Sequence, residues 1–280
     1  MDTKEINLEN YLERIGFSGR PVANLQCLRK LVTQHIRSIP FENVTSFLGR
    51  PVDIELKSIE SKLVMQRRGG YCFEQNSLLR SALQKIGFAV TDLAARVLWQ
   101  VPVGHPAAQS HMILMVEVEG KRYLLDAGFG SNTLTAPLEI DIGARQSTPH
   151  GVYRLTLSDQ DYLLEVNIAG TWEPVYSFDL RPRTLGDYKI ANWYCCTHPN
   201  SRFVEHLIAA RSFPEGRHAL FNRQLSYQPV VGSKSVVILA DVEELRVTLL
   251  EIFGIEVPSD AEVDSKLTRI FEKVIPGGVV

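Results

Sequence analysis

The sequence predicts an α+β fold built from three consecutive segments. Hydrophobic residues recur at helical spacing up to Gly87, alternate with polar residues at a period of two in the stretch that follows, and show both patterns near the C-terminus. A chain of 280 residues is long for one hydrophobic core, since domains commonly span about 100–200 residues. We therefore expect three domains, which comprise residues 1–87, 88–190 and 191–280.

Helices are expected throughout the first segment. Their apolar residues fall on one face, and a glycine follows the first, third and fourth of them as a stop signal. The expected helices span about residues 7–15, 22–36, 59–67 and 72–86.

The second segment is expected to form antiparallel strands, because alternating runs are separated by Gly, Asp or Asn at the turns. A barrel and a sandwich both fit this pattern. Residues 133–151 contain two prolines and two glycines and are expected to form a long loop. The expected strands span residues 89–101, 111–118, 122–127, 153–157, 162–168 and 171–175.

The third segment combines strand and helix signals. Residues 218–227 and 235–240 have the pattern of a hairpin. Two final helices are expected to begin at capping boxes, which read DVEE at 241–244 and SDAE at 259–262.

Composition and charge exclude several classes of protein. The net charge of −2 gives no reason to expect a nucleic acid or a membrane surface as partner. No run approaches the roughly 20 apolar residues of a transmembrane helix, and the polar N-terminus does not have the pattern of a signal peptide. The four cysteines have no disulfide-framework spacing. A reducing cytoplasm is the expected location.

Cys72 is the first candidate for chemistry. It follows a glycine pair and precedes an amphipathic run, so the thiol is expected in the first turn of a helix. Unpaired backbone N–H groups and the helix dipole favour a negative charge there. Helix N-termini and cationic neighbours can lower a thiol pKa from about 8.5 to about 3.5–7.5, and the thiolate is the nucleophile. The alternative is a structural cysteine buried behind a glycine turn.

His111 and Asp126 are the candidate partners of the thiol. His111 begins one expected strand, and Asp126 lies near the end of the next, inside an apolar stretch where a carboxylate needs a partner. With an even number of residues in the intervening loop, both side chains lie on one face of the hairpin, and a four-residue loop places them directly opposite each other. An odd loop separates them. The alternatives are a satisfied core histidine and a turn residue before Gly128.

Four motifs resemble the arylamine N-acetyltransferase family. They read IPFEN at 39–43, RGGYCFE at 68–74, LDAGFG at 125–130 and ANWY at 191–194 continuing to THPNSRF at 197–203, and a strand that starts at His111 accompanies them. They follow the family's order over about residues 10–205, whereas the last 75 residues carry no specific motif. Ala127 stands where valine is most frequent in the family.

The resemblance implies a fold of three domains: a helical bundle that holds Cys72, an antiparallel β-barrel that holds His111 and Asp126, and a small α/β lid. Their catalytic core is similar to that of cysteine proteases. The implied reaction transfers an acetyl group from acetyl-coenzyme A to the nitrogen of an arylamine or arylhydrazine, or to the oxygen of an N-hydroxyarylamine. It proceeds by a ping-pong mechanism through acetyl-Cys72. Acetyl-coenzyme A is then a co-substrate, and no cofactor is bound permanently.

The resemblance also implies binding residues. Phe41, Val97 and Phe129 are candidates for the acceptor pocket, and Phe203 is a candidate for contacts shared with the coenzyme. Gly128 and Gly130 flank Phe129 and allow the backbone to approach a ligand. For each of these residues the alternative is an ordinary core position or a tight turn. No glycine-rich nucleotide motif is present, so the donor is expected in a cleft between the second and third segments.

Other interpretations of the same residues remain. A papain-like cysteine hydrolase would use the same three side chains, and an amide synthase shares the fold. A redox sensor would leave His111 and Asp126 unexplained. A metal site is disfavoured, because the Cys-x-x-His spacing at 195–198 has no second ligand pair. The sequence leaves open whether the protein is a monomer or a homodimer.

Overall fold

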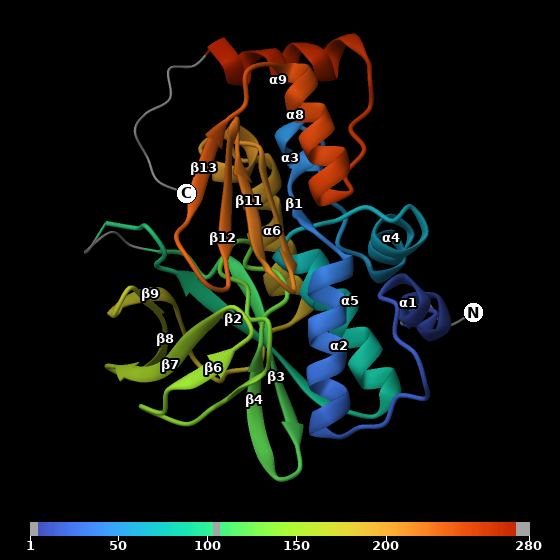
Figure 1. Ribbon diagram of the computed structural model, residues 1–280. Coiled ribbons are helices and arrows are strands. Elements are labelled where there is room, and N and C mark those ends of the chain that lie inside the picture. Colours follow the sequence, from blue (N-terminus) through green and yellow to red (C-terminus); the bar gives the residue numbers. More distant parts are fainter. Residues whose placement is uncertain (1–4, 103–106, 273–280) are drawn as a thin grey trace.

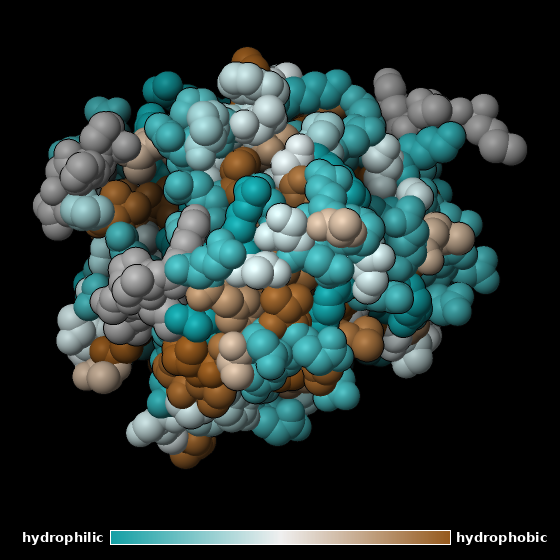
Figure 2. Space-filling model, turned by 90° about the horizontal axis from the view of Figure 1, so that it is seen from above, coloured by the Kyte–Doolittle hydropathy of each residue, from teal (hydrophilic) through white to brown (hydrophobic). Residues whose placement is uncertain are grey.

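The computed structural model describes residues 5–102 and 107–272. A helical layer, a large antiparallel sheet and a smaller sheet capped by two helices succeed one another along the chain (Figure 1). The expected α+β class is confirmed. Among the described residues, no helix has the length and apolar character needed to cross a membrane. The face seen from above is mostly hydrophilic, with hydrophobic residues gathered in a few patches (Figure 2).

The first segment contains the expected helices. The helices are α1 (Leu8–Arg14), α2 (Leu25–Ser38), α3 (Val44–Phe47), α4 (Leu56–Glu60) with its π-helical continuation η1 (Ser61–Met65), and α5 (Cys72–Ile86). Helix α2 begins at Leu25 and not at residue 22, because the Asn24 side chain caps it by accepting a hydrogen bond from the Cys27 N–H. Helix α5 ends at Gly87, which has a left-handed backbone with φ of 109°. The short helix α3 was not predicted.

A buried network of charges joins the strand β1 (Phe41–Glu42) to the loop before α5. The Glu42 carboxylate is fully buried and lies 2.7 Å from Arg68 Nη2 and 3.7 Å from Lys62 Nζ. Burial raises the pKa of Glu42, but the two cations outweigh this effect and hold it below its ordinary value of 4.5. The glycine pair allows this close packing, since a Cβ on Gly69 would lie 2.3 Å from the Pro40 carbonyl oxygen.

The second segment folds into an eight-stranded antiparallel sheet in the order β5-β4-β3-β2-β9-β8-β7-β6. The Gln146 side chain on β6 donates to the Glu139 carbonyl of β5 and accepts from its N–H, so the sheet nearly closes into a barrel. The strands are β2 (Ala89–Val97), β3 (His111–Val118), β4 (Lys121–Leu125), β5 (Leu138–Glu139), β6 (Gln146–Thr148), β7 (Gly151–Ser158), β8 (Asp161–Ile168) and β9 (Thr171–Phe178).

Two expectations for this segment were wrong. The stretch 133–151 is not one long loop, because it contains β5 and β6, which are too short to show a period of their own. The strand expected at 89–101 ends at Val97, where the backbone leaves the ladder and the N–H groups of Leu98 and Trp99 both bond to the Val175 carbonyl.

The third segment forms a five-stranded sheet in the order β1-β10-β11-β12-β13, so the N-terminal strand β1 completes it. Residues 218–227 are not a single strand, because a turn at Asn222 and Arg223 separates β11 from β12. Strand β10 was not predicted. The elements are α6 (Leu185–Thr197), α7 (Arg202–Glu205), β10 (Ile208–Phe213), β11 (Gly216–Phe221), β12 (Gln224–Pro229), β13 (Ser235–Ile238), α8 (Val242–Thr248), its π-helical continuation η2 (Leu249–Phe253) and α9 (Ala261–Glu272).

Helix α8 begins at Asp241 as expected, with the Asp241 side chain accepting from the Glu244 N–H. At the last helix the side-chain cap is Asp260 and not Ser259, since Asp260 accepts from the Val263 N–H.

The boundary expected at residue 190 falls inside helix α6. Tyr188 donates its hydroxyl to the Leu93 carbonyl of the barrel, and Asn192 donates its amide to the Val52 carbonyl of the first segment. Helix α6 therefore packs on both preceding segments and ties them together. Hydrophobic residues from all three segments also share one core cluster, which runs from Ile6 to Ala219. The division into three domains stays a prediction.

Replacing Glu42 with Gln should lower the free energy of unfolding by about 2–4 kcal/mol, because Arg68 and Lys62 would lose their buried counter-charge. The pKa of Glu42 is lowered in the fold, so its contribution is present above pH 4.5 and is lost as the pH falls through the folded-state pKa. Urea unfolding of both proteins at pH 7 and at lower pH measures this difference.

Glu55→Gln is the matched control. Glu55 pairs with Lys189 at 2.6 Å, but both side chains are 53% exposed, so its loss should cost less than about 1 kcal/mol. Equal losses in the two variants would contradict a special role for the buried network.

Candidate active site

Cys72 is the first residue of helix α5, as the sequence predicted. Tyr71 is extended and its N–H donates to the Glu74 carboxylate at 3.1 Å, which fixes the start of the helix. The Cys72 side chain is buried within the protein, yet it lines a cavity. Its backbone N–H has no acceptor within the helix, because the first helical residues lack one. The thiol therefore lies at the positive end of the helix dipole, inside a cavity.

His111 and Asp126 lie on one face of the β3–β4 hairpin. Val118 pairs with Lys121, so the connecting turn has two residues, Glu119 and Gly120, and an even loop is confirmed. Both turn residues have positive φ, 53° and 74°, as in the tight turns that suit twisted hairpins. Continuing the observed register places Asp126 opposite residue 113. The directly opposed pairing that a four-residue loop would give is therefore not found, and His111 meets Asp126 diagonally.

The imidazole and the carboxylate are bonded. His111 Nε2 lies 2.7 Å from Asp126 Oδ2, and both side chains are buried. Because Nε2 faces Asp126, the other ring nitrogen, Nδ1, is the atom available for the hydrogen bond with Cys72. Burial by itself lowers the pKa of His111, but the charge and hydrogen bond of Asp126, aided by Cys72, raise it to about 10. The ring is thus held as an imidazolium beside the thiol.

Asn76 is a site residue that the sequence analysis missed. Its Nδ2 donates to the Met112 carbonyl at 2.7 Å and to Asp126 Oδ1 at 3.2 Å, and its Oδ1 accepts from the Ala127 N–H at 2.9 Å. It is fully buried, one helical turn after Cys72. A polar residue four positions after the thiol, on the same side of the helix, was the available signal. Asn76 fixes the carboxylate relative to the helix that carries the Cys72 thiol.

Gly128 lets the loop after β4 (Lys121–Leu125) touch the start of α5. A Cβ at this position would lie 2.5 Å from the Cys72 Cα, which no side chain tolerates. The Gly128 N–H also donates to Asp126 Oδ1 at 2.9 Å. Residue 130 has a φ of 93° in the turn, a backbone conformation that favours glycine. The close approach at Gly128 is therefore to the protein's own backbone.

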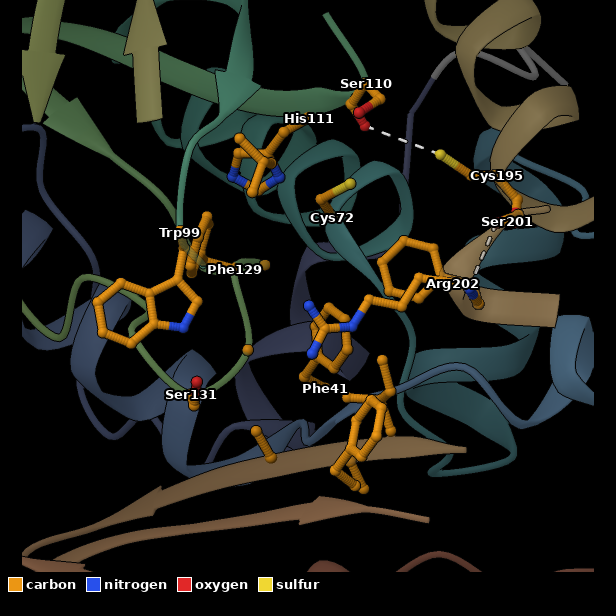
Figure 3. A pocket seen from close by; sticks show the side chains of 18 of the residues that line it. Phe41, Cys72, Trp99, Ser110, His111, Phe129, Ser131, Cys195, Ser201 and Arg202 are labelled. Carbon is orange, nitrogen blue, oxygen red and sulfur yellow. Dashed lines mark hydrogen bonds between the residues drawn. The ribbon is translucent and has the colours of Figure 1, made fainter. Parts of the chain in front are cut away.

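A cavity of about 270 Å³ opens beside these groups. Cys72 and His111 line it (Figure 3), whereas Asp126 is fully buried and reaches the site through its bond to the imidazole. All six residues expected to bind substrates also line the cavity: Phe41, Val97, Gly128, Phe129, Gly130 and Phe203. The sequence analysis did not name several others, which include Trp99, Ser110, Ser131, Tyr194, Cys195, Ser201, Arg202 and Phe221. Ser201 and Arg202 belong to the motif in which only Phe203 was singled out.

The walls of the cavity are largely aromatic. The Phe129 ring meets the His111 ring edge-on, with centroids 5.3 Å apart. Phe203, from the third segment, lies 6.1 Å from the Phe41 ring and 5.4 Å from the Tyr71 ring. Such tilted and edge contacts add to the stability of packed rings. The third segment therefore reaches the site through Phe203 and adds an aromatic side chain to the wall of the cavity.

The residues that the structure describes hold no group of three His, Cys, Asp or Glu side chains placed for a metal ion. Cys27, Cys72, Cys195 and Cys196 are all free thiols. His198, the last residue of the Cys-x-x-His spacing, stacks on the Tyr194 ring with centroids 4.6 Å apart.

Comparisons with known proteins agree with this arrangement. The family model described as N-acetyltransferase matches residues 24–262. The arylamine N-acetyltransferase of Mycolicibacterium smegmatis is 43% identical over 225 residues, which are 79% of this chain and 82% of that protein. The one from Escherichia coli is 37% identical over 251 residues, 89% of each chain.

Solved structures give the same result. The M. smegmatis arylamine N-acetyltransferase superposes with a TM-score of 0.91 at 37% identity, covering 96% of this chain and all of that one. The Mycobacterium marinum arylamine N-acetyltransferase in complex with CoA has a TM-score of 0.91 at 34% identity, covering 94% of this chain and 99% of that one. By sequence and by fold, this chain belongs to the arylamine N-acetyltransferase family.

Proposed function

We propose that the protein transfers an acetyl group from acetyl-coenzyme A to the nitrogen of an arylamine or arylhydrazine, or to the oxygen of an N-hydroxyarylamine. The observation that carries this proposal is the bonded His111–Asp126 pair beside the Cys72 thiol in an aromatic cavity. The names of the relatives support the reaction, and the M. marinum relative was solved with CoA. Acetyl-coenzyme A acts as a co-substrate, without a permanently bound cofactor.

The first half-reaction acetylates Cys72. The thiolate attacks the carbonyl carbon of the thioester, and a new C–S bond forms as the bond to coenzyme A breaks. The His111 imidazolium gives its proton to the departing sulfur, so free coenzyme A leaves as a thiol. Exchange of one thioester for another is nearly thermoneutral, which suits a thiol nucleophile better than a hydroxyl. The Cys72 backbone N–H, free at the helix start, is placed to stabilise the developing oxyanion.

The second half-reaction discharges the acetyl group. The acceptor nitrogen attacks acetyl-Cys72, His111 accepts the proton from that nitrogen, and Cys72 leaves as a thiolate. The charges explain why one residue can act as an acid and then as a base. Cys72 is one of the groups that raise the pKa of His111, and acetylation removes its charge. The pKa of His111 is therefore lower in the acetyl-enzyme than in the free enzyme, so the neutral imidazole forms more readily there.

Different residues of the cavity are proposed to contact the acceptor and the coenzyme. Phe41, Val97 and Phe129 provide apolar surface for the acceptor ring, and Phe203 lies where both the acceptor and the coenzyme can meet it. Gly128 and Gly130 hold the loop that carries Phe129 against helix α5 (Cys72–Ile86). The coenzyme enters from the cleft between the second and third segments. A location in the cytoplasm, independent of nucleic acids and membranes, stays a prediction, and the oligomeric state is open.

Mixing the protein with acetyl-coenzyme A should add one acetyl group to the peptide that contains Cys72, and an arylamine should remove it. Intact-protein and peptide mass spectrometry measure both steps, and double-reciprocal plots should give parallel lines. Cys72→Ala should abolish labelling and lower the rate by at least about 10³-fold, as expected when a covalent nucleophile is lost.

Cys27→Ala is the control, because Cys27 lies on α2 (Leu25–Ser38) outside the cavity. This variant should be labelled normally. Intersecting kinetic plots, or full activity in Cys72→Ala, would rule out the acetyl-cysteine pathway. Rapid discharge of the acetyl group by water, without an amine, would favour the papain-like hydrolase instead.

The His111 imidazole should titrate with a pKa of about 10 in the wild-type protein, followed by NMR of its ring protons. In Asp126→Asn the pKa should fall, because the main group that raises it is gone and burial then dominates. The rate of amine acetylation in this variant should drop at least about 100-fold. A folded variant with an unchanged His111 pKa would contradict the proposed ion pair.

The same pair predicts how stability changes with pH. The folded-state pKa of His111 lies above its ordinary value of 6.5, so its contribution is present below pH 6.5 and is lost as the pH rises toward 10. The difference in unfolding free energy between the wild-type protein and Asp126→Asn should therefore shrink across that range. Urea unfolding at pH 6.5 and at pH 10 measures it.

A further inference from the structure

One charged side chain in the cavity has no role in the steps above. Arg202, the first residue of α7 (Arg202–Glu205), lines the cavity together with Cys72 and the aromatic residues. Figure 3 shows its side chain reaching across the cavity, toward the side on which Trp99 and Ser131 lie. Among the described residues that line the cavity, it is the one whose charge is permanent at neutral pH.

No acidic side chain balances this charge in the part of the chain that the structure describes. Arg202 forms no ion pair there, and its guanidinium lies over the Phe221 ring, 5.0 Å from Cζ to the centroid. The stacking orients the planar guanidinium and leaves its N–H groups free to donate around its edge. Arg202 remains accessible to solvent, and its partial burial at the cavity lowers its pKa.

The surroundings favour an anion that arrives with a flat, apolar body. Phe41, Phe129 and Trp99 provide apolar surface for a ring, and an acceptor nitrogen must lie beside Cys72 and His111 to react. We expect a substituent on the side of that ring opposite the amine to extend away from the thiol, within reach of Arg202, whose side chain crosses the cavity. A guanidinium matches a carboxylate in geometry and charge, because it donates two parallel N–H groups.

We propose that Arg202 makes the enzyme selective for arylamines that carry an anionic substituent, above all a carboxylate, on the side of the ring away from the amine. This inference rests on the proposed function, whose acceptor class it narrows. The carboxylate replaces water around the guanidinium and supplies the counter-charge that the cavity lacks. The interaction lies in the second half-reaction, since the acceptor enters after coenzyme A has left.

The test compares two acceptors of nearly equal size, 4-aminobenzoate and 4-aminobenzamide, which differ in charge. In a ping-pong enzyme, kcat/KM for the acceptor reports the second half-reaction alone, so the donor does not affect the comparison. In Arg202→Met, the ratio of kcat/KM for the carboxylate to that for the amide should fall roughly 10- to 100-fold relative to the wild-type protein, the usual strength of a hydrogen bond to a charged group. Arg202→Lys should keep part of the preference.

Arg29→Met is the matched control, because it removes the same charge from the exposed face of α2, outside the cavity. Its ratio should equal that of the wild-type protein. An unchanged ratio in Arg202→Met would overturn the inference, and so would an equal loss with both acceptors together with a raised KM for acetyl-coenzyme A. The latter would place Arg202 in donor binding. Failure of the proposed function is distinct, since it would appear as absent acetylation of Cys72.

Discussion

The contact between the first turn of α5 and the loop after β4 determines whether the site can work. Cys72 belongs to a helical segment, and His111 and Asp126 belong to a barrel, so no local structure brings them together. Gly128 permits the approach, because any side chain there would overlap the Cys72 Cα. Asn76 then bonds the helix to β3 through the Met112 carbonyl and to the loop after β4 through Asp126. A shift of about 1 Å between the segments would separate the thiol from the imidazole, and such shifts are costly in catalysis.

Burial and charge act together at this contact. Asp126 is fully buried, and a lone carboxylate in such a place would be strongly destabilising. It is stable because it accepts hydrogen bonds from His111, Asn76 and the Gly128 N–H. The same low-dielectric surroundings strengthen its hold on the His111 proton. The hydrogen bonds that stabilise the buried Asp126 carboxylate therefore also fix the position of the His111 imidazole. One set of bonds serves both the stability of the fold and the geometry of the site.

The sequence predicts the three proposed reacting groups better than it predicts the residues around them. The glycine pair and the amphipathic run place Cys72 at a helix start, and strand alternation places His111 and Asp126 on one face. His111 and Asp126 are offset by two residues, because the hairpin turn has two residues and direct opposition needs four. Glu119 in this turn has a positive φ, which is uncommon for glutamate and so could not be predicted from the residue type.

Other elements depend on partners distant in the chain and leave no local signal. Strand β1 has two residues and forms by pairing with β10, more than 160 positions away. Strands β5 and β6 are held by the Gln146 side chain and by neighbouring strands, without a period of their own. Nothing in the sequence around Trp99 and Arg202 marks them as site residues. They line one cavity only because the folded chain brings them together. Residues proposed to react can thus be recognised from local sequence patterns. Residues proposed to select the substrate can be recognised only in the tertiary structure.

The third segment supplies the selection because it is fastened to the other two. Helix α6 bonds to the barrel through Tyr188 and to the first segment through Asn192, which fixes the chain that leads to Phe203. Asn43 then donates to the carbonyls of Phe203 and His206, which anchors both ends of the short helix α7. Arg202 lies within this anchored turn, so its reach into the cavity is set by bonds to the same N-terminal segment that carries Cys72. This anchoring helps Arg202 to discriminate between substrates. If the guanidinium were ordered only on binding, the lost conformational entropy would offset part of its interaction energy with the substrate.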